Sequence, residues 1–397
     1  MTALPSRREA GPSVGAGARV ALAVADVNWF TSENLFREVS RENVSTLLLK
    51  CRDYRNALQS GVPPWAWGTS LRRKGPALWE RDLVLPSGWM KRFPRFGMRP
   101  IERSIRTWRE SEVGSSELLL VMTYPHYLYL RDKVRPDRSV YFNIDDYSMY
   151  WPRFADRVNE LERQAVRESD LTVCVSKVRT EQLKAAVPES AGKIRHLPHG
   201  APSFSVAAEP WNRPSPAPPD LVALPRPYLG YIGTLEDRVD WELLSRIAVE
   251  FPDASIVIVG KPGPDTRESW SIDRRKCLAR PNVHLLGWRP QERISRYNSA
   301  FDVCLIPYRT DHPFNRNCSP TKIMDYMGSG RPIVSTDLPE CRLYERLFHV
   351  AEGTDAFLEA VRSILASDSD DGRASLRLEW ARDHTCRKVA HRLLDML

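Results

Sequence analysis

The sequence has no long apolar run and no cysteine pair at the C-x-x-C spacing, and each absence argues against a class of protein. No stretch approaches the roughly 20 apolar residues of a membrane-spanning helix, and the N-terminal residues lack the apolar core of a secretory signal. We therefore expect a cytoplasmic protein. The seven cysteines are odd in number and lie mostly inside expected strands and helices, so we predict buried free thiols rather than a disulfide framework or a zinc site.

Recognition motifs for nucleic acid are missing as well. The formal net charge of +8 favours an anionic partner, which could be nucleic acid, an anionic membrane face or a phosphorylated substrate. No helix-turn-helix, zinc-finger or RNA-recognition signature accompanies this charge, so we expect no nucleic-acid partner. The chain has 397 residues, of which 42% are hydrophobic and 27% charged, and this composition is typical of a folded protein with room for two domains.

Proline is concentrated in residues 207–227, where neither a helix nor a central strand is expected. Short, continuously apolar segments alternate with helical patterns on both sides of this linker. Continuous rather than alternating hydrophobicity indicates strands covered on both faces, as in a parallel sheet. We predict an α/β fold with Rossmann-like domains in residues 1–206 and 228–372 and a final helix in 373–397. The expected strands are residues 19–25, 44–49, 118–122, 140–144, 171–175, 228–232, 255–259, 283–286, 302–306 and 333–335.

The start of a helix near residue 320 is suited to binding phosphate. Ser319 can cap this helix and Pro320 suits its first position, so the N–H groups of residues 321–323 should point out of the helix end. That end carries partial positive charge, and the ammonium group of Lys322 adds a full one. Asp325 lies one turn further on, where a carboxylate can accept ribose hydroxyls. The alternative is an ordinary capped helix. The predicted donor-binding residues of this segment are Ser319, Pro320, Thr321, Lys322 and Asp325.

Residues 317–336 resemble the donor-sugar signature of GT-B glycosyltransferases, in which a helix after a Ser/Pro-containing loop runs into the pattern Glu/Asp-Tyr-x-x-x-Gly-x-Pro-Ile/Val-Val. The usual form has a Glu eight positions before the second acid, where this chain has Asn317, and its second acid is the shorter Asp325. The resemblance implies two domains facing each other across a cleft, a nucleotide diphosphate-sugar donor, with a UDP-sugar expected, and a final helix crossing back to the first domain. We expect no cofactor and no metal, because the helix end with Lys322 can stabilise a departing diphosphate.

Two more loops of the second domain follow expected strands. Gly233 permits close approach of a phosphate, and Thr234 and Arg238 come after it. This segment is similar to the glycine loop that faces the diphosphate in glycosyltransferases. It lacks G-x-G-x-x-G, which disfavours a dinucleotide-dependent dehydrogenase. Gly260 and Lys261 end the next strand, and the resemblance implies that their loop flanks the nucleotide base. Either loop could instead be an ordinary turn.

Asp145 and Asp146 follow the expected strand 140–144, at the carboxyl end where a cleft should lie. A general base must reach the acceptor hydroxyl, and it benefits from a pKa raised by burial or by a neighbouring negative charge. Xanthan-type glucuronosyltransferases and cell-wall transferases with an Asp-Asp-Tyr/Phe motif look similar at this point. Successive residues at a strand end point opposite ways, so we predict that one aspartate is catalytic and the other structural, as a cap of the following helix, 154–166.

Residues 160–176 and 194–200 resemble the family's passage from an acidic helix through an Ala-Asp-x-Val strand to an Asn-Gly loop, with His199 in place of the Asn. The ring of His199 could donate to a phosphate, or His199 could be a turn residue. The resemblance covers about residues 140–350 well and the first 130 residues poorly.

The poorly matched part mixes aromatic and basic residues. Tryptophans at positions 65, 67, 79 and 89 are interspersed with arginine and lysine. Such a segment suits an anionic membrane interface, where aromatic rings lie at headgroup depth and each cation adds about 1 kcal/mol. A lipid-linked acceptor would be presented there. The alternative is that the tryptophans are core residues and the cations are solvated. The predicted acceptor or membrane surface consists of Trp89, Lys91, Arg92 and Arg95.

We therefore expect an enzyme that transfers a sugar from a nucleotide diphosphate to a hydroxyl of a carbohydrate or lipid-linked acceptor, in surface polysaccharide or glycolipid assembly. The aspartate pair favours an inverting reaction, and the basic charge favours peripheral association with the cytoplasmic face of a membrane. Three alternatives stay open. One is a retaining transferase without a base, another is an epimerase or hydrolase on the same fold, and the third is a non-catalytic protein that binds nucleotide sugars.

Overall fold

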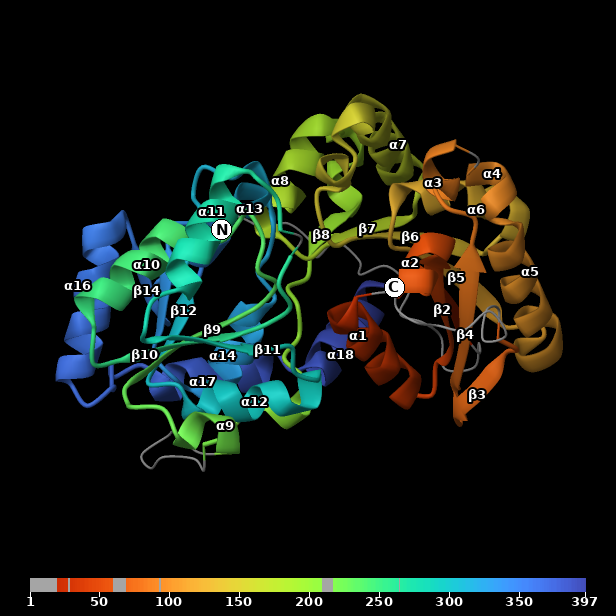
Figure 1. Cartoon of the computed structure of the whole chain (residues 1–397). Helices are drawn as coiled ribbons and strands as arrows, with labels where there is room; N and C mark the ends of the chain where they lie inside the picture. The colour runs from red at the N-terminus through yellow and green to blue at the C-terminus, as the bar shows by residue number, and fades with distance from the viewer. Residues whose placement is uncertain (1–19, 28, 60–68, 93, 209–216, 264) are drawn as a thin grey trace, which may run out of the picture.

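A computed structural model describes residues 20–27, 29–59, 69–92, 94–208, 217–263 and 265–397. They form two α/β domains that lie side by side, as Figure 1 shows. Each domain is built on its own sheet, and the predicted pair of parallel-sheet domains is confirmed. Of the helices in the described ranges, none is long and apolar enough to cross a membrane. All seven cysteines are buried and none forms a disulfide, as predicted.

The first domain contains an eight-stranded sheet with the order β3-β4-β2-β1-β5-β6-β7-β8. Its strands pair in parallel except for the edge pair β3 and β4, which is antiparallel. The strands are β1 (Val20–Ala25), β2 (Ser45–Asp53), β3 (Arg72–Gly75), β4 (Leu78–Leu85), β5 (Glu117–Met122), β6 (Arg138–Asn143), β7 (Leu171–Cys174) and β8 (Ile194–His196). The helices are α1 (Phe30–Arg41), α2 (Tyr54–Gln59), α3 (Trp89–Arg92), α4 (Pro94–Gly97), α5 (Arg99–Trp108), α6 (Leu128–Val134), α7 (Ala155–Glu168) and α8 (Lys177–Ala186).

The second domain contains a six-stranded parallel sheet with the order β11-β10-β9-β12-β13-β14. Its strands are β9 (Tyr228–Ile232), β10 (Ser255–Val259), β11 (Val283–Gly287), β12 (Val303–Ile306), β13 (Ile333–Thr336) and β14 (His349–Ala351). The helices of this part of the chain are α9 (Pro219–Val222), α10 (Trp241–Glu250), α11 (Ser269–Leu278), α12 (Gln291–Ala300), α13 (Pro313–Asn317), α14 (Lys322–Ser329), α15 (Pro339–Arg342), α16 (Thr354–Ala366), α17 (Ala374–Asp383) and α18 (Cys386–Met396).

Both faces of the first sheet are covered, which explains why its central strands are apolar throughout. One core contains Ile101 of α5, Leu128 of α6 and Val158 of α7, and the core on the other face contains Phe36 of α1 and Leu393 of α18. A strand between two such layers buries successive side chains on opposite faces, so both sets must be apolar. The expected strands of continuous hydrophobicity all appear, with ends shifted by a few residues.

The last segment crosses back to the first domain, as the resemblance implied, but it does so as two helices. Helix α17 packs on α14 of the second domain, and α18 packs on α1 of the first. Figure 1 shows this arrangement, with the blue α18 beside the red α1. The prediction of one helix over 373–397 was wrong because the chain breaks at Thr385, whose hydroxyl caps α18 by accepting from the N–H of Lys388.

The described part of the proline-rich linker also differs from expectation. Residues 209–216 lie outside the described ranges, but Pro219–Val222 form the single turn of α9. Proline is tolerated there because the first turn of a helix has no use for its missing N–H. The carbonyl of Leu221 accepts a hydrogen bond from the Tyr228 hydroxyl (2.7 Å), which ties this turn to the first strand of the second domain.

Candidate active site

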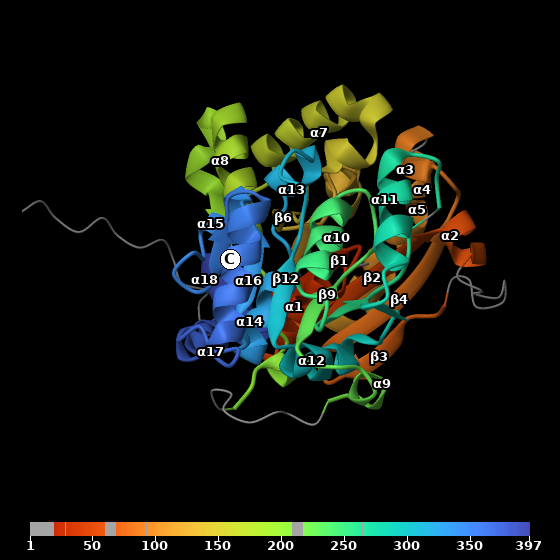
Figure 2. The same cartoon turned by 60° about the vertical axis from the view of Figure 1, so that its left-hand side comes forward.

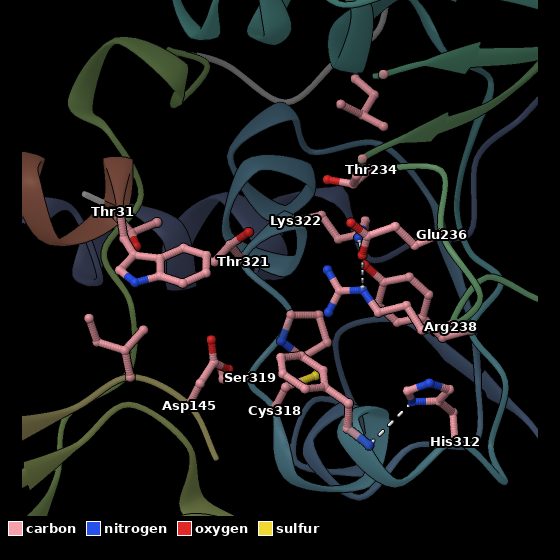
Figure 3. A pocket seen from close by; sticks show the side chains of 18 of the residues that line it. Thr31, Asp145, Thr234, Glu236, Arg238, His312, Cys318, Ser319, Thr321 and Lys322 are labelled. Carbon is pink, nitrogen blue, oxygen red and sulfur yellow. Dashed lines mark hydrogen bonds and ion pairs between the residues drawn. The ribbon is translucent and has the colours of Figure 1, made fainter. Parts of the chain in front are cut away.

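A cavity of about 930 Å³ lies between the two domains. Loops that follow β1 and β6 form its first-domain wall. Loops that follow β9, β10, β11 and β12, together with the start of α14, form its second-domain wall. These are the carboxyl ends of parallel strands, where open α/β sheets bind their ligands. In Figure 3, Asp145 and Thr31 lie on one side of the cavity and Arg238 and Lys322 on the other.

The start of α14 forms part of the second-domain wall, but its local structure differs from the prediction. The helix begins at Lys322, and Thr321 occupies the cap position without a side-chain cap bond, so Ser319 is not the cap and Pro320 is not the first helical residue. The N–H of Ile323 is also not free, because it donates to the carbonyl of Pro320 (3.0 Å). The cause is a tighter first turn, in which i to i+3 bonds replace a capping side chain. Residues 319–322 still line the cavity.

Lys322 and Arg238 converge on one aromatic ring. The ammonium group of Lys322 donates a hydrogen bond to the Tyr308 hydroxyl and lies 4.1 Å from the ring centroid. The guanidinium carbon of Arg238 lies 5.2 Å from the same centroid. Burial opposes ionisation of the Tyr308 hydroxyl, but the two cations lower its pKa below the ordinary value. An anionic group placed at this wall would therefore meet two positive charges at once.

The backbone that carries Arg238 is fixed by hydrogen bonds from the loop after β12. The carbonyl of Arg238 accepts from the N–H of Arg309 (3.0 Å) and from the side-chain amide of Asn315 (2.9 Å). The guanidinium group also lies 5.0 Å from the ring of Phe314. The prediction placed Arg238 near the diphosphate from its position after Gly233, and the structure brings it to the same wall as Lys322.

The loops after β9 and β10 touch each other, and glycine is required for this contact. A Cβ atom on Gly260 would come within 1.9 Å of the Gly233 carbonyl oxygen, so no other residue fits at that position. Thr234 and Lys261 extend from these loops to the cavity, and the side chain of Lys261 is exposed. The structure therefore places all five predicted residues of the two loops, Arg238 among them, on the cavity wall.

Asp325 lines the cavity one turn into α14, as predicted. The amide of Gln291 on α12 donates to both of its carboxylate oxygens, at 3.4 and 3.3 Å. Burial raises the pKa of Asp325 to about 6, although Gln291 and the Lys322 charge both lower it. The carboxylate can accept hydroxyl groups, and its contact with the ribose stays a prediction.

Asp145 is the carboxylate of the first-domain wall. Strand β6 ends at Asn143, whose amide donates to the Asp145 carbonyl (3.0 Å) and fixes the exit of the chain. One carboxylate oxygen of Asp145 accepts from the Tyr150 hydroxyl (2.8 Å). Burial raises the pKa of Asp145 to about 6, and this effect exceeds the opposing effects of the Tyr150 hydrogen bond and the Arg238 charge. A carboxylate with such a pKa can accept a proton near neutral pH.

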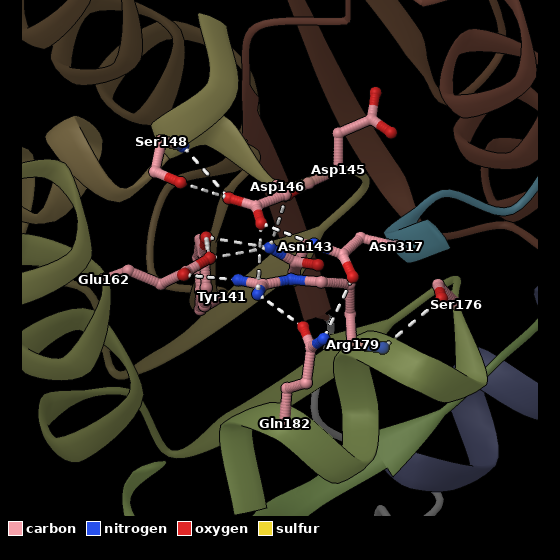
Figure 4. A network of polar contacts seen from close by, with 10 residues as sticks. All are labelled: Tyr141, Asn143, Asp145, Asp146, Ser148, Glu162, Ser176, Arg179, Gln182 and Asn317. Carbon is pink, nitrogen blue, oxygen red and sulfur yellow. Dashed lines mark hydrogen bonds and ion pairs between the residues drawn. The ribbon is translucent and has the colours of Figure 1, made fainter. Parts of the chain in front are cut away.

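Asp146 does not line the cavity, and its carboxylate is fully engaged elsewhere. One oxygen accepts from the N–H (3.2 Å) and the hydroxyl (2.6 Å) of Ser148, and the other accepts from the amide of Asn317 (2.9 Å). The expected division into one cavity residue and one cap therefore appears, and Figure 4 shows the two carboxylates pointing apart. Asp146 caps the short 3-10 turn Tyr147–Tyr150, whereas the prediction had a cap for the helix after it.

Comparison with known proteins finds a matching family model for the second domain. Residues 226–367 match the family model of the glycosyl transferases group 1. This match lies in the second domain and shows that residues 226–367 are similar to that family. TuaH of Bacillus subtilis (strain 168), named as a teichuronic acid biosynthesis glycosyltransferase, is 21% identical over 272 residues, which are 66% of this chain and 66% of TuaH, just under two thirds of each.

Two solved structures have the same GT-B fold over nearly their whole length. Sucrose-phosphate synthase from Thermosynechococcus elongatus is similar with a TM-score of 0.70 and 14% identity, over 94% of this chain and 97% of that chain. HepE of Anabaena, in complex with UDP and glucose, has a TM-score of 0.64 and 12% identity, over 95% of this chain and 98% of that chain. At such identities the likeness establishes the fold alone.

Several aromatic residues of the GT-B cleft were missed by sequence reasoning. The rings of Trp29 and Tyr150 lie 6.3 Å apart on the first-domain wall, and Tyr150 lies 5.7 Å from Phe314 of the second. Trp288, which is 64% exposed, follows β11 at the far end of the cavity. Their only signal was position, since Trp29, Trp288 and Tyr308 each come within a few residues of a strand's carboxyl end.

His199 also lines the cavity of this GT-B protein. It is 6% exposed, and burial lowers its pKa to about 4, so the ring is neutral at pH 7. A neutral imidazole still carries one N–H and can donate to an anion, which leaves both interpretations of His199 compatible with its place.

The predicted acceptor or membrane surface is only partly exposed. Trp89 is 5% exposed, with its ring 6.0 Å from that of Tyr127, so its assignment to a surface was wrong. Trp79 is likewise buried, because residues 78–85 form β4, and Trp65 and Trp67 lie outside the described residues. The side chains of Lys91 and Arg92 also lie outside the described part. Arg95 is exposed and lies 5.4 Å from the ring of Tyr129.

Proposed function

We propose that this protein transfers a sugar from a nucleotide diphosphate to an acceptor hydroxyl with inversion of configuration, and that Asp145 is the general base. The observation that carries the proposal is the pairing of two walls in one cavity, with a buried carboxylate whose pKa is raised to about 6 on one side and the Lys322 and Arg238 cations on the other. The match of residues 226–367 to the glycosyl transferases group 1 supports a transferase.

In the proposed reaction, Asp145 takes the proton of the acceptor hydroxyl as its oxygen attacks the anomeric carbon of the donor sugar. The new glycosidic bond forms on the face opposite the diphosphate, and the bond from the anomeric carbon to the phosphate oxygen breaks. The diphosphate leaves with the bonding electron pair and gains negative charge. Lys322, Arg238 and the start of α14 would stabilise that charge, which is the part that a divalent cation plays in other transferases.

The residues that line the two walls of the cavity also indicate the chemical class of the donor and of the acceptor. The two cations suit a nucleoside diphosphate, and HepE binds UDP, so we propose a UDP-sugar. A carbohydrate suits a wall of aromatic rings, because its C–H faces can pack on the rings and its hydroxyl groups can bond to the polar groups beside them. TuaH is named for teichuronic acid biosynthesis, and we propose a carbohydrate or lipid-linked acceptor in surface polysaccharide or glycolipid assembly.

The proposal is tested by incubating the protein with a panel of nucleotide sugars and measuring nucleotide release with and without candidate acceptors. We expect release of a nucleoside diphosphate that depends on the acceptor. Release without any acceptor would indicate a hydrolase, conversion of the sugar without release would indicate an epimerase, and binding without either reaction would indicate a non-catalytic protein.

A further inference from the structure

Asn317 lies at the interface between the two domains, and its side chain faces the first domain. It ends α13, two residues before Ser319 of the cavity wall. Its amide nitrogen donates to a carboxylate oxygen of Asp146 (2.9 Å), and its amide oxygen accepts from the side chain of Gln182 on α8 (3.0 Å). Both ends of this one amide are therefore used by first-domain partners, as Figure 4 shows.

Three hydrogen bonds, which we call the relay, connect Arg179, Gln182, Asn317 and Asp146. The relay begins at a group that can only donate and ends at a group that can only accept. Arg179 donates to the side-chain oxygen of Gln182 (2.8 Å), Gln182 donates to Asn317, and Asn317 donates to Asp146. A guanidinium has no acceptor and a carboxylate has no donor, so both amides in the relay have only one orientation that satisfies every partner. This fixed direction makes the residue type at position 317 chemically specific.

The first-domain end of the relay is firmly held. Arg179 pairs with Glu162 of α7 (2.5 Å), and Glu162 in turn accepts from the amide of Asn143 at the end of β6 (2.8 Å). Arg179 also lies 3.6 Å from the carboxylate of Asp146. The chain that leaves β6 toward Asp145 is thus anchored on one side by its own domain and on the other by Asn317.

The second domain contacts α8 at another point as well. Glu340 of α15 accepts from the Ser176 hydroxyl (3.1 Å) and from the N–H of Lys177 (3.1 Å) at the start of that helix. Figure 2 shows α15 below α8, where the two domains meet. Two independent contacts therefore set how α8 lies against the second domain, and Asn317 is the one that also reaches the loop of Asp145.

We propose that Asn317 is a positioning residue, which joins the donor-binding loop of the second domain to the Asp145 loop of the first. A carboxylate at position 317 could still accept from Gln182, but it could not donate to Asp146 and would place a second negative charge beside it. The amide accordingly fixes the position of the two walls of the cavity relative to each other. This inference rests on the proposed role of Asp145 as the base.

The test uses Asn317→Asp, which changes the group without changing its shape, and the double exchange Asp146→Asn with Asn317→Asp. In the double variant the amide at 146 can donate to the carboxylate at 317, Gln182 can still donate to that carboxylate, and Ser148 still meets an oxygen at position 146. The hydrogen bonds between positions 182, 317 and 146 are therefore retained, with the one between 317 and 146 reversed and the negative charge moved from 146 to 317. Only the contact of Arg179 with the carboxylate at 146 (3.6 Å) is lost. Gln164→Glu on the exposed face of α7 is the control for the added negative charge.

We expect Asn317→Asp to lower kcat by about ten- to a hundredfold, with the KM and Kd for the donor changed much less, because a misplaced base slows the reaction while the donor loops stay intact. The double exchange should recover most of that loss, and Gln164→Glu should match the parent. A double variant as slow as Asn317→Asp, or an Asn317→Asp variant with parental kcat, would overturn the proposal.

Failure of this inference and failure of the proposed function give different results. If Asp145→Asn keeps parental turnover, the base has been assigned to the wrong residue. If Asp145→Asn is inactive but Asn317→Asp behaves as the parent, only the positioning role of Asn317 is wrong. Melting temperatures of all the variants show whether a loss of kcat comes from unfolding, and recovery in the double exchange excludes that explanation directly.

Discussion

The second-domain wall of the cavity carries the Lys322 cation at the start of α14 and the Arg238 cation on the loop after β9, whereas the first-domain wall carries one buried carboxylate among aromatic rings. Cations suit a group that gains negative charge, and a carboxylate with a pKa raised to about 6 suits a group that loses a proton. Because each domain contributes one of these properties, donor binding and acceptor activation should be separable by substitution. The predictions below test that separation.

The largest effect is expected for Asp145→Asn. Turnover should fall by about 10²- to 10⁴-fold, the usual contribution of a positioned base, while the donor still binds because the second-domain wall is unchanged. Turnover at saturating donor and calorimetric titration with the nucleotide sugar measure the two quantities. A folded variant with near-parental turnover would place the base elsewhere, or would indicate a retaining reaction that uses none.

Lys322→Ala should impair both the binding of the donor and the stabilisation of the departing diphosphate at the second-domain wall. Loss of its ammonium group should lower kcat by about 10²- to 10³-fold and also weaken donor binding, since the charge acts on the bound and the departing diphosphate. Lys276→Ala, which removes an exposed cation of α11 that does not line the cavity, is the matched control and should have a much smaller effect. If Lys322→Ala has parental affinity and kinetics, Lys322 does not belong to the site.

The pH dependence of kcat/KM should report Asp145. The active form is the carboxylate, so the rate should be constant well above pH 6 and fall about tenfold per pH unit well below it. Tyr150→Phe removes a hydrogen bond that lowers the pKa of Asp145, so the midpoint should move to higher pH. The measurement is a pH–rate profile of both proteins, and a profile flat between pH 5 and 8 (about one unit below to two above the expected midpoint) would contradict the assignment.

The two aspartates should differ in stability as well as in rate. Asp146→Asn should lower the free energy of unfolding by about 1–2 kcal/mol. The amide oxygen can keep the bonds from Ser148, but the amide NH2 then faces the donors of Asn317 and Arg179. Burial raises the pKa of Asp145, so the folded state favours its protonated form, and this group contributes less stability as pH rises through 6. Asp145→Asn should therefore be no less stable than the parent at neutral pH. Denaturant unfolding of both variants decides this.

The smallest effect is expected at the edge of the first domain. Replacement of Lys91, Arg92 and Arg95 by Gln should reduce binding to anionic vesicles, at about 1 kcal/mol per charge, and leave binding to neutral vesicles unchanged. Added salt should have the same effect as the substitutions. The burial of Trp89 leaves fewer aromatic residues for such a surface than the sequence suggested. A parent protein that does not bind anionic vesicles at low salt would end the idea.

The fold was predictable where burial on both faces leaves a continuous apolar strand. The missed strands have other compositions. Strand β4 contains Glu80, which is 5% exposed and paired with Arg37 of α1. The charge of Glu80 interrupts the apolar pattern by which a buried strand is predicted. Strands β8 and β14 have three residues each, which is too short for a pattern to show. Sequence patterns reveal burial by apolar residues and do not reveal burial by ion pairs.

The site was predictable where chemistry lies at the carboxyl ends of strands. Asp145 and the loops of Gly233 and Gly260 were located in this way, because strand order fixes where those ends meet. The contacts that distinguish Asp145 from Asp146 could not be predicted. They depend on Asn317, which is 171 residues from Asp146 in the sequence. Only the packing of the two domains brings these two residues together.

The most direct test of the account is the anomeric configuration of the product, measured by proton NMR early in the reaction once the donor is identified. An aspartate base on the wall opposite the Lys322 and Arg238 cations predicts a glycosidic bond of inverted configuration relative to the nucleotide sugar. A product that retains the configuration would contradict the assignment of Asp145 as the base.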